Sequence, residues 1–504
     1  MRSVLLRTAL AALAVALVPP AGTAAAGAAN LPDPCPRSAA LHPGAGAAPL
    51  YRTVAPFEHF DSGRSQLFPS TCTLTELTHS SRPVLRTRTA PGTYATPYIA
   101  ATRDRDELFV YGYGSDAARD GAFVARVSAR TLHERWRTRI TDTAPSPAWS
   151  YPGVLLVHRN GFVYAVYANN LIKLDPRTGR IVRRLTLPED PAQTGAAYNG
   201  MVVLPDGTLA LKKLERGPCP GSRPTDAASN EAITGLICAG QNALPSLLLL
   251  VDPDRLRVLT RTTPPETVTG RITAARFRGR TYIYCAGRDS LFRYRVSAGH
   301  RLTLDRGWGP VPYRSGAEQP GTGPGVMGDW IVVQTNFLPS SAPLRVTAVS
   351  QADGNRRYSA KPFLVPMAPP SSLGKINSFE TSKASLDPAN HRVYTHDQGA
   401  GGLAALTLDP AHGFTIAWRV VNHSLGFSAL VGPASRRQLV FNDNAGGLGD
   451  EAVWYDASTG RERLRGGRLS TRTAPGNIIT PGFAGRFYYL SAEGRLMELR
   501  PVAG

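Results

Sequence analysis

A short turn motif recurs along this chain, and its recurrence constrains the fold more than any other feature. The motif is clearest at residues 174–180, Leu-Asp-Pro-Arg-Thr-Gly-Arg, and at residues 455–461, Tyr-Asp-Ala-Ser-Thr-Gly-Arg. Fainter copies lie at residues 127–136, 251–257, 350–358 and 408–418. In these copies an apolar strand runs into a polar turn, after which a second strand begins. A repeat at intervals near fifty residues is typical of a β-propeller.

Apolar segments that follow a turn mark the expected innermost strand of each repeat unit. They begin near Thr96, Tyr151, Tyr198, Ile272, Val326, Asn377, Phe427 and Ile478, which predicts eight four-stranded blades, with seven as the alternative. The spacings are 47–55 residues, except for 74 residues between Tyr198 and Ile272. That longer interval contains residues 215–244, rich in glycine, proline and serine, which we interpret as an insertion in blade three.

The last repeat unit has only three candidate strands, at residues 477–480, 486–490 and 495–499. An unpaired strand edge leaves a row of N–H and C=O groups open, so a propeller closes its ring when one terminus supplies the missing strand. Residues 82–89, just before blade one, are the natural donor. The predicted organisation is an N-terminal extension at residues 30–93 that includes this strand, followed by a single all-β propeller at residues 94–504.

The first 29 residues have the features of a secretory signal peptide. A basic start is followed by a short apolar run and a stretch of small residues with Ala-x-Ala sites. The apolar run is shorter than the roughly 20 residues that a membrane-spanning helix needs, and no later run is long enough. We therefore expect a secreted monomer without a transmembrane segment, either extracellular or associated with the cell wall.

The formal charge of +20 raises the question of a nucleic-acid partner. The basic residues are nearly all arginine, and the lysines are confined to positions 173, 212, 213, 361, 375 and 383. No dense basic run with interleaved aromatic residues occurs. This pattern favours compositional bias over a specific nucleic-acid surface, and attachment to an acidic cell wall fits either interpretation.

Five cysteines leave one unpaired in an oxidising compartment. The pairs close in sequence are Cys35 with Cys72 and Cys219 with Cys238, the second bracketing the insertion in blade three. Cys285 then remains free, and its aromatic strand predicts a buried and inert thiol.

The turn motif, extended to Asp-x-x-Thr-Gly-x-x-x-Trp, resembles the tryptophan-docking repeat of quinoprotein-like eight-bladed propellers. Matching positions are Asp175, Thr178 and Gly179, then Asp456, Thr459 and Gly460, with tryptophans at 136 and, one residue late, at 418. The resemblance spans about residues 94–500. That superfamily contains alcohol dehydrogenases dependent on pyrroloquinoline quinone (PQQ) as well as noncatalytic scaffolds. Its quinone enzymes carry an adjacent cysteine pair beside the cofactor, and this sequence has no Cys-Cys.

Propeller geometry gathers the loops between second and third strands on one face, around the mouth of the central channel. The ligand-binding candidates expected there are Tyr198, Asn199, Arg288, Asn336 and Asn377. The catalytic candidates are Glu380, His396 and Asp397, which could supply an acid and a base. Asp443 and Asp450 flank a glycine-rich loop and are candidate ligands for a divalent cation such as calcium.

Two functions fit these features. The first is a binding or scaffold protein whose mouth face holds a small molecule, a glycan or a peptide. The alternative is an extracellular enzyme acting in the channel, either a quinone- or metal-dependent oxidoreductase or a lyase or hydrolase. The sequence contains no His-Glu-x-x-His, Gly-x-Ser-x-Gly or phosphate-loop motif, which favours the binding protein.

Overall fold

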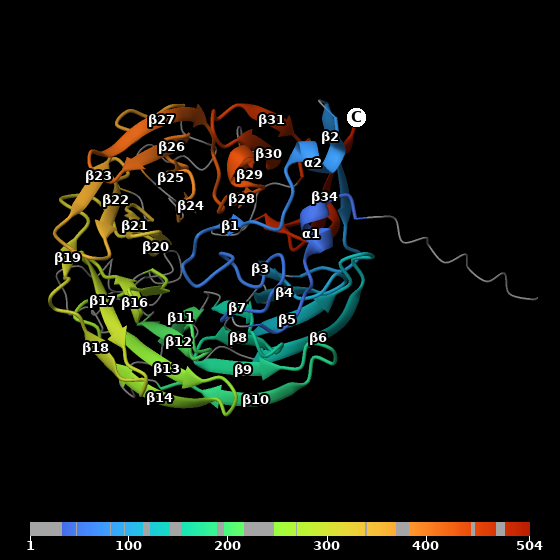
Figure 1. The fold of residues 1–504 in the computed structure, drawn as a ribbon. Helices are drawn as coiled ribbons and strands as arrows, with labels where there is room; N and C mark the ends of the chain where they lie inside the picture. Colours follow the sequence, from blue (N-terminus) through green and yellow to red (C-terminus); the bar gives the residue numbers. More distant parts are fainter. Residues whose placement is uncertain are drawn as a thin grey trace, which may run out of the picture. The chain divides into compact units, whose positions relative to one another are not determined.

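Eight sheets follow one another along the chain and stand as blades around a common centre (Figure 1). The computed structural model describes residues 33–46, 48–80, 82–94, 96–113, 121–141, 153–188, 196–215, 246–268, 270–337, 340–368, 378, 383–444, 449–469 and 479–504. Asp33–Gly504 form one compact unit. The prediction of an all-β propeller with eight four-stranded blades is confirmed.

Blades one to four are built from strands that are consecutive in sequence. From the inside outwards, blade one has β3 (Thr96–Thr102), β4 (Leu108–Tyr113), β5 (Ala122–Val127) and β6 (Glu134–Thr141), and blade two has β7 (Val154–Val157), β8 (Val163–Tyr167), β9 (Asn170–Leu174) and β10 (Ile181–Thr186). Blade three has β11 (Ala196–Val203), β12 (Leu209–Glu215), β13 (Leu247–Asp252) and β14 (Arg257–Thr262). Blade four has β15 (Thr273–Phe277), β16 (Arg280–Ala286), β17 (Ser290–Val296) and β18 (Leu302–Leu304), with β19 (Val311–Pro312) beside β17.

Blades five to eight complete the ring and include two strands from the N-terminal extension. Blade five has β20 (Gly325–Met327), β21 (Trp330–Gln334), β22 (Val346–Ser350) and β23 (Arg357–Ala360), and blade six has β24 (Ser385–Asp387), β25 (Arg392–Asp397), β26 (Gly402–Asp409) and β27 (Gly413–Val421). Blade seven has β1 (Leu67–Phe68), β28 (Ala429–Val431), β29 (Gln438–Asp443), β30 (Glu451–Asp456) and β31 (Glu462–Arg465). Blade eight has β32 (Thr480–Pro481), β33 (Phe487–Leu490), β34 (Leu496–Ala503) and β2 (Pro83–Thr89). The helices among the described residues are short: α1 (Pro36–Ala40), α2 (Leu74–Thr78), η1 (Ala434–Arg436) and η2 (Phe483–Gly485).

The ring closes as predicted. Strand β2 pairs antiparallel with β34 along its whole length, from Pro83 opposite Ala503 to Thr89 opposite Met497. The last three strands of the chain thereby gain their fourth partner from the N-terminal extension. Because the donated strand covers the edge of β34, that edge does not stay open as a template for aggregation.

Two tryptophans fix neighbouring blades to each other through the recurring turn. The Trp136 ring of blade one donates its indole N–H to the Pro176 carbonyl in the turn of blade two, at 3.2 Å. Trp418 of blade six makes the same bond to Ala457 of blade seven, at 3.1 Å. Gly460, with a φ of +74°, lies so close to Trp418 that a Cβ atom would be 2.7 Å from the ring. Glycine is therefore required in this turn for its conformation and for space.

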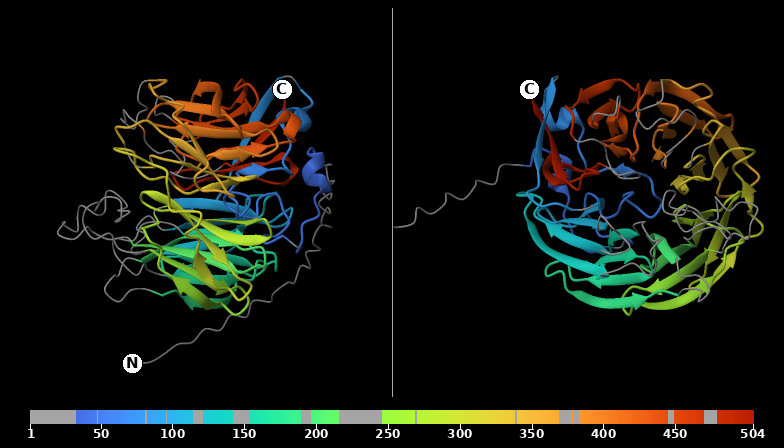
Figure 2. Two further views of the ribbon diagram at one scale, coloured as in Figure 1. Left: turned by 60° about the vertical axis from the view of Figure 1, so that its left-hand side comes forward. Right: turned by 180° about the vertical axis from the view of Figure 1, so that it is seen from behind.

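A stretch of the extension that carries no repeat motif follows the inner wall of the ring. We call residues 53–68 the inner segment. It lies inside the ring in the views from both sides (Figures 1 and 2). Its carbonyl groups accept hydrogen bonds from the innermost strands, in blade order: Thr102 to Ala55, Val157 to Pro56, Ala274 to Ser62, Val326 to Gly63, Leu386 to Ser65 and Leu430 to Gln66. In blade three the Ser62 hydroxyl donates to the Val203 carbonyl at 2.7 Å.

The inner segment thus satisfies strand N–H groups that point into the centre of the ring and would otherwise need water. To follow the curved wall, the segment bends at three non-glycine residues with positive φ, namely Phe60, Arg64 and Gln66. It then forms β1, which pairs parallel with β28. The first part of the extension consequently fills the ring, while its last part closes it.

The innermost strand of blade six differs in position from the prediction. This strand, β24, begins at Ser385, whereas the sequence pattern placed its start near Asn377. Asn377 and the expected signal peptide lie outside the described residues, as does the expected insertion at residues 215–244 except for Glu215, the last residue of β12. The insertion and the signal peptide stay predictions.

Two of the three predictions about the cysteines fall on described residues, and the third does not. Cys35 and Cys72 form the predicted disulfide, with 5.6 Å between their Cα atoms, and it ties α1 to the chain just before α2. Cys285 in β16 is a buried free thiol, and burial raises its pKa to about 12. A thiol with such a pKa is a poor nucleophile at neutral pH. Cys219 and Cys238 lie outside the described residues.

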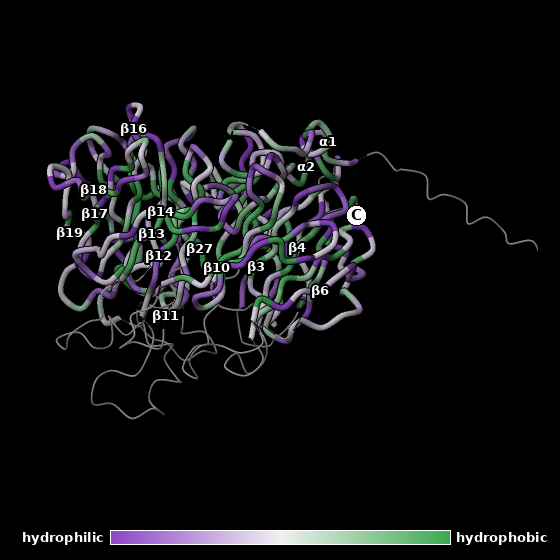
Figure 3. The backbone as a smooth tube through the Cα atoms, turned by 90° about the horizontal axis from the view of Figure 1, so that it is seen from below, coloured by the Kyte–Doolittle hydropathy of each residue, from purple (hydrophilic) through white to green (hydrophobic). Residues whose placement is uncertain are grey.

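The strands carry apolar residues between two more hydrophilic faces of the ring, and α1 and α2 lie at one of these faces (Figure 3). The opposite face, formed by the turns between second and third strands, is the mouth face of the sequence prediction. Within the described ranges, no helix has the length and apolar character needed to cross a membrane.

Candidate functional site

A buried group of ions lies at the inner ends of blades one to four, against the inner segment. Arg64 of the inner segment donates to the Glu58 carboxylate at 2.7 Å, and Arg271 approaches the same oxygen to 3.2 Å. These three side chains are at most 8% exposed. Two guanidinium groups therefore share one carboxylate, an arrangement that is stable only because further acceptors satisfy the remaining N–H groups.

Arg271 makes many of these hydrogen bonds. It precedes the innermost strand of blade four, so its side chain starts from the inner wall of the ring. Its guanidinium donates to the Tyr98 hydroxyl of blade one at 2.9 Å and to the Asn199 carbonyl of blade three. A longer bond of 3.4 Å reaches the Gly153 carbonyl beside blade two. One side chain thus connects the inner ends of four blades to the inner segment. The role of Arg271 could not be predicted from the sequence, because arginine is abundant and Glu58 is remote in sequence.

Lys383 and Asp61 interact electrostatically with each other near this cluster. Burial lowers the pKa of Lys383 to about 7, with Arg64 adding to the effect and Asp61 opposing it. Burial also raises the pKa of Asp61, against hydrogen bonds from Ser65. Burial and the nearby cations lower the pKa of His59 well below its usual value, so this ring is neutral at pH 7.

Tyr198 and Asn199, two predicted ligand-binding residues, lie at a bulge near the mouth end of β11. The Tyr198 hydroxyl donates to the Pro188 carbonyl at 2.5 Å, and the residue is fully buried. The Asn199 side-chain oxygen is also buried, yet no described group donates a hydrogen bond to it. Buried polar atoms are seldom left without a partner, so Asn199 offers an acceptor for a ligand or water.

Arg288 and Asn336 occupy predicted positions in turns of the mouth face. The side chain of Arg288 is 35% exposed and donates to Asp289 at 2.9 Å. Asn336 is fully buried, with its amide oxygen accepting from the Gln319 N–H at 2.8 Å and its NH₂ group donating to Ala342. Its φ of +71° suits the left-handed conformation that asparagine tolerates. Asn336 thus holds the turn together, whereas Arg288 remains accessible.

His396 and Asp397, two of the three predicted catalytic candidates, end strand β25 and are both buried. The imidazole packs edge-on against Phe441 of blade seven with ring centres 4.7 Å apart, and burial lowers its pKa to about 3. Asp397 accepts hydrogen bonds from the Ser378 hydroxyl and the Ala400 N–H. Neighbouring residues in a strand point to opposite faces, so β25 separates these two side chains. Glu380, their proposed companion, lies outside the described residues.

Asp443 and Asp450, the predicted cation ligands, are bound by groups of the chain itself. Asp443 accepts from the His423 N–H at 2.9 Å and from Arg465 at 3.1 Å; burial opposes these bonds, but they lower its pKa. Asp450 accepts from Asn442, Asn444 and Tyr489 at 2.6–3.0 Å. Among the described residues no cluster of three acidic, histidine or cysteine side chains could hold a metal ion.

Among the described residues, the inner segment and the side chains of Glu58, Arg64 and Arg271 occupy part of the centre of the ring. The adjacent cysteine pair that the resemblance implies beside PQQ is absent from this sequence. The one disulfide of the described residues lies in the N-terminal extension and joins cysteines 37 positions apart, unlike the adjacent pair beside the quinone in the enzymes that the sequence resembles.

The described sheets form an eight-bladed propeller, and solved quinohemoprotein structures share this fold. A quinohemoprotein alcohol dehydrogenase from Pseudomonas putida HK5 is similar in structure, with a TM-score of 0.55 and 11% identity over 89% of this chain and 80% of that one. The quinohemoprotein alcohol dehydrogenase from Comamonas testosteroni gives 0.52 and 12%, over 86% and 75%. No protein-family model and no curated protein matches the sequence. At these identities the likeness concerns the fold.

Proposed function

We propose that this protein is a secreted binding or scaffold propeller, which holds a glycan, a peptide or a small molecule at the mouth face and performs no chemistry of its own. The observation that carries the proposal is the buried network of Glu58, Arg64 and Arg271 inside the ring. It makes the ring a rigid support and leaves recognition to the faces.

The described mouth residues support a binding role in a second way. Asp443, Asp450 and Asn336 are engaged by the chain itself, so their polar groups stabilise turns. Arg288 is 35% exposed beside its partner Asp289, and the buried side-chain oxygen of Asn199 has no donor among the described residues. A cation and a buried acceptor suit a ligand with an anionic group and a hydroxyl or amide donor, as glycans and peptides provide.

The proposal is tested by binding the purified protein to an immobilised array of neutral and acidic oligosaccharides and short peptides. We expect at least one ligand whose affinity falls by about tenfold in Arg288→Ala and in Asn199→Ala, which corresponds to about 1.4 kcal/mol. Arg255→Ala, an exposed arginine in a turn of the opposite face, is the matched control and should retain wild-type affinity.

A parallel assay addresses the alternative, an oxidoreductase in the channel. The protein is incubated with PQQ and Ca²⁺, dialysed, and assayed for dye-coupled oxidation of alcohols and aldose sugars. We expect no retained quinone and no dye reduction. Quinone retention with turnover, lost in Glu380→Gln, would replace the binding role by the enzymatic one.

A further inference from the structure

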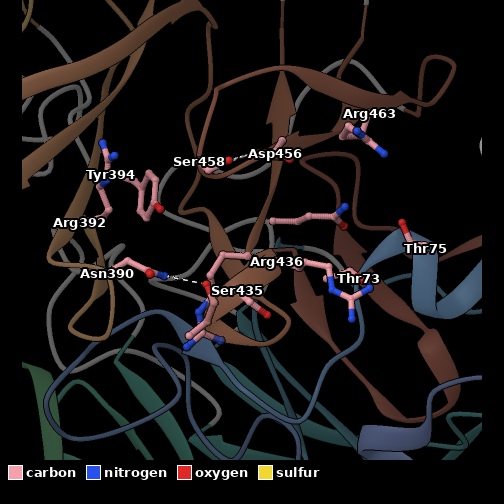
Figure 4. Close-up of a pocket in the computed structure, with 13 residues that line it drawn as sticks. Thr73, Thr75, Asn390, Arg392, Tyr394, Ser435, Arg436, Asp456, Ser458 and Arg463 are labelled. Carbon is pink, nitrogen blue, oxygen red and sulfur yellow. Dashed lines mark hydrogen bonds between the residues drawn. The ribbon is translucent and has the colours of Figure 1, made fainter.

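A polar pocket lies between blades six and seven, on the face that carries α2 (Figure 4). It has a volume of about 450 Å³, within the usual size range of small-ligand sites. Its walls come from the turns between first and second strands of both blades and from the start of α2. It lies at the face opposite to the mouth, so an inference about it is independent of the proposed function.

The pocket is strongly basic. Its lining includes four arginines, Arg392, Arg436, Arg437 and Arg463, against a single acidic residue, Asp456. Burial opposes ionisation of Asp456, but hydrogen bonds from Ser458 and Thr459 outweigh it and lower the pKa, so this carboxylate is charged and already occupied by its own turn. The excess positive charge is therefore not neutralised by the lining itself.

Within the described part of the chain, most of these arginines also lack a carboxylate partner. Only Arg437 approaches one, the Asp387 carboxylate at 3.4 Å, and it also donates to the Gly432 carbonyl. One terminal nitrogen of Arg392 is buried with no hydrogen-bond acceptor among the described residues. A buried guanidinium N–H without an acceptor is costly, and an anion in the pocket would satisfy it.

The remaining lining provides groups that suit a hydroxylated ligand. Asn390, Arg392 and Tyr394 lie on one side of the pocket, while Thr73, Thr75 and Arg463 lie on the other (Figure 4). Thr75 is exposed and can exchange hydrogen bonds with hydroxyls, and the Asn390 amide oxygen can accept one, because its NH₂ group is what bonds Asp387 and Ala434.

We propose that this pocket binds the phosphate group of a phosphorylated sugar or polyol. The planar guanidinium groups of Arg392, Arg436 and Arg463 match phosphate oxygens in pairs, and the polar wall accepts the attached hydroxyl-bearing unit. The same chemistry is offered by a free sugar phosphate and by a polymer such as poly(glycerol phosphate).

The test is isothermal titration calorimetry with glucose 6-phosphate, glucose and poly(glycerol phosphate), using the full mature chain. Glucose 6-phosphate or the polymer should bind, and glucose should not. Arg392→Gln and Arg463→Gln should each weaken binding by about tenfold or more. Arg436→Gln should act in the same direction, and because this exposed side chain has no described partner, its loss leaves the fold intact.

Arg461→Gln is the matched control, since this exposed arginine lies in the turn next to the pocket but outside its lining. Wild-type affinity in this variant supports the site, and a loss as large as that of Arg463→Gln would overturn it in favour of general attraction by a basic surface. Absence of binding by both phosphate probes, or equal binding of glucose, would also overturn it. Binding of the polymer alone assigns the site to a polymeric source, and binding of glucose 6-phosphate alone assigns it to a free phosphate ester.

Discussion

At the scale of single residues, the stability of the ring depends on charges held away from water. Glu58 receives both Arg64 and Arg271, and removing one partner of a buried pair leaves an uncompensated charge. We expect Arg271→Leu to lower the free energy of unfolding by about 3–5 kcal/mol, measured by urea denaturation. Arg180→Leu, at an exposed turn, is the control. Equal stabilities of the two variants would show that the cluster does not hold the ring together.

Lys383 predicts a dependence of stability on pH. Its folded-state pKa of about 7 lies below the usual value of 10.5, so between these values the unfolded chain binds a proton that the folded chain has released. The free energy of unfolding should therefore rise with pH in this window, by up to about 1.4 kcal/mol per pH unit. Asp61 and Arg64 are the charged groups that act on Lys383.

Replacing Lys383 by Met should remove this contribution, so the variant gains more stability over wild type at pH 7 than at pH 10. Thermal unfolding across this range measures the difference. Lys361→Met, which removes a lysine paired with Glu318 at 3.1 Å near the surface, serves as control. Parallel pH profiles for wild type and Lys383→Met would contradict a neutral buried amine.

The partners of the predicted site residues could not be predicted from the sequence. His396 and Asp397 are adjacent and chemically suited to catalysis, but strand geometry sends their side chains to opposite faces. Asp443 and Asp450 have oxygen atoms suited to a cation, yet Arg465 and nearby amides bind them. A sequence pattern does not show which side chains distant in the chain will bind a given residue. For the same reason, the role of Arg271 could not be predicted.

At the scale of the element, the recurring turn joins blades through glycine and tryptophan. Gly460 and Gly279 have similar φ values, +74° and +78°, but a Cβ atom would meet Trp418 at 2.7 Å in the first case and nothing within 4 Å in the second. We expect Gly279→Ala to cost about 1 kcal/mol through backbone strain alone. Gly460→Ala should cost about 1–3 kcal/mol more, through displacement of the tryptophan.

Chemical denaturation of the two alanine variants measures this difference, with tryptophan fluorescence reporting on Trp418. If both substitutions had the same cost, contact between turn and tryptophan would contribute nothing to the junction of blades six and seven.

The elements were predictable where a local pattern determines them. The repeated turn located the blades, and the three-stranded last unit required a closing strand, found at Pro83–Thr89. The prediction of blade six was less accurate. Its innermost strand begins at Ser385 and has only three residues, too few to show an alternation of apolar and polar side chains. The inner segment has no repeat and bends at non-glycine residues such as Phe60 and Arg64, so nothing in its sequence indicated its course.

At the scale of the whole molecule, the N-terminal extension both closes the ring and fills it. The two roles explain why a chain with degenerate repeats forms a complete propeller: one strand covers the edge of blade eight, and the inner segment covers the inward edges of blades one to seven.

Amide hydrogen exchange of the innermost strands would show whether the inner segment covers their inward edges. The N–H groups of Thr102, Val157, Ala274, Val326, Leu386 and Leu430 point into the ring and donate to the inner segment. If the segment fills the ring, these amides exchange as slowly as those paired within the blades. Rapid exchange at these six positions, with the paired amides of the same blades still protected, would mean that the centre is open to water and would contradict the account.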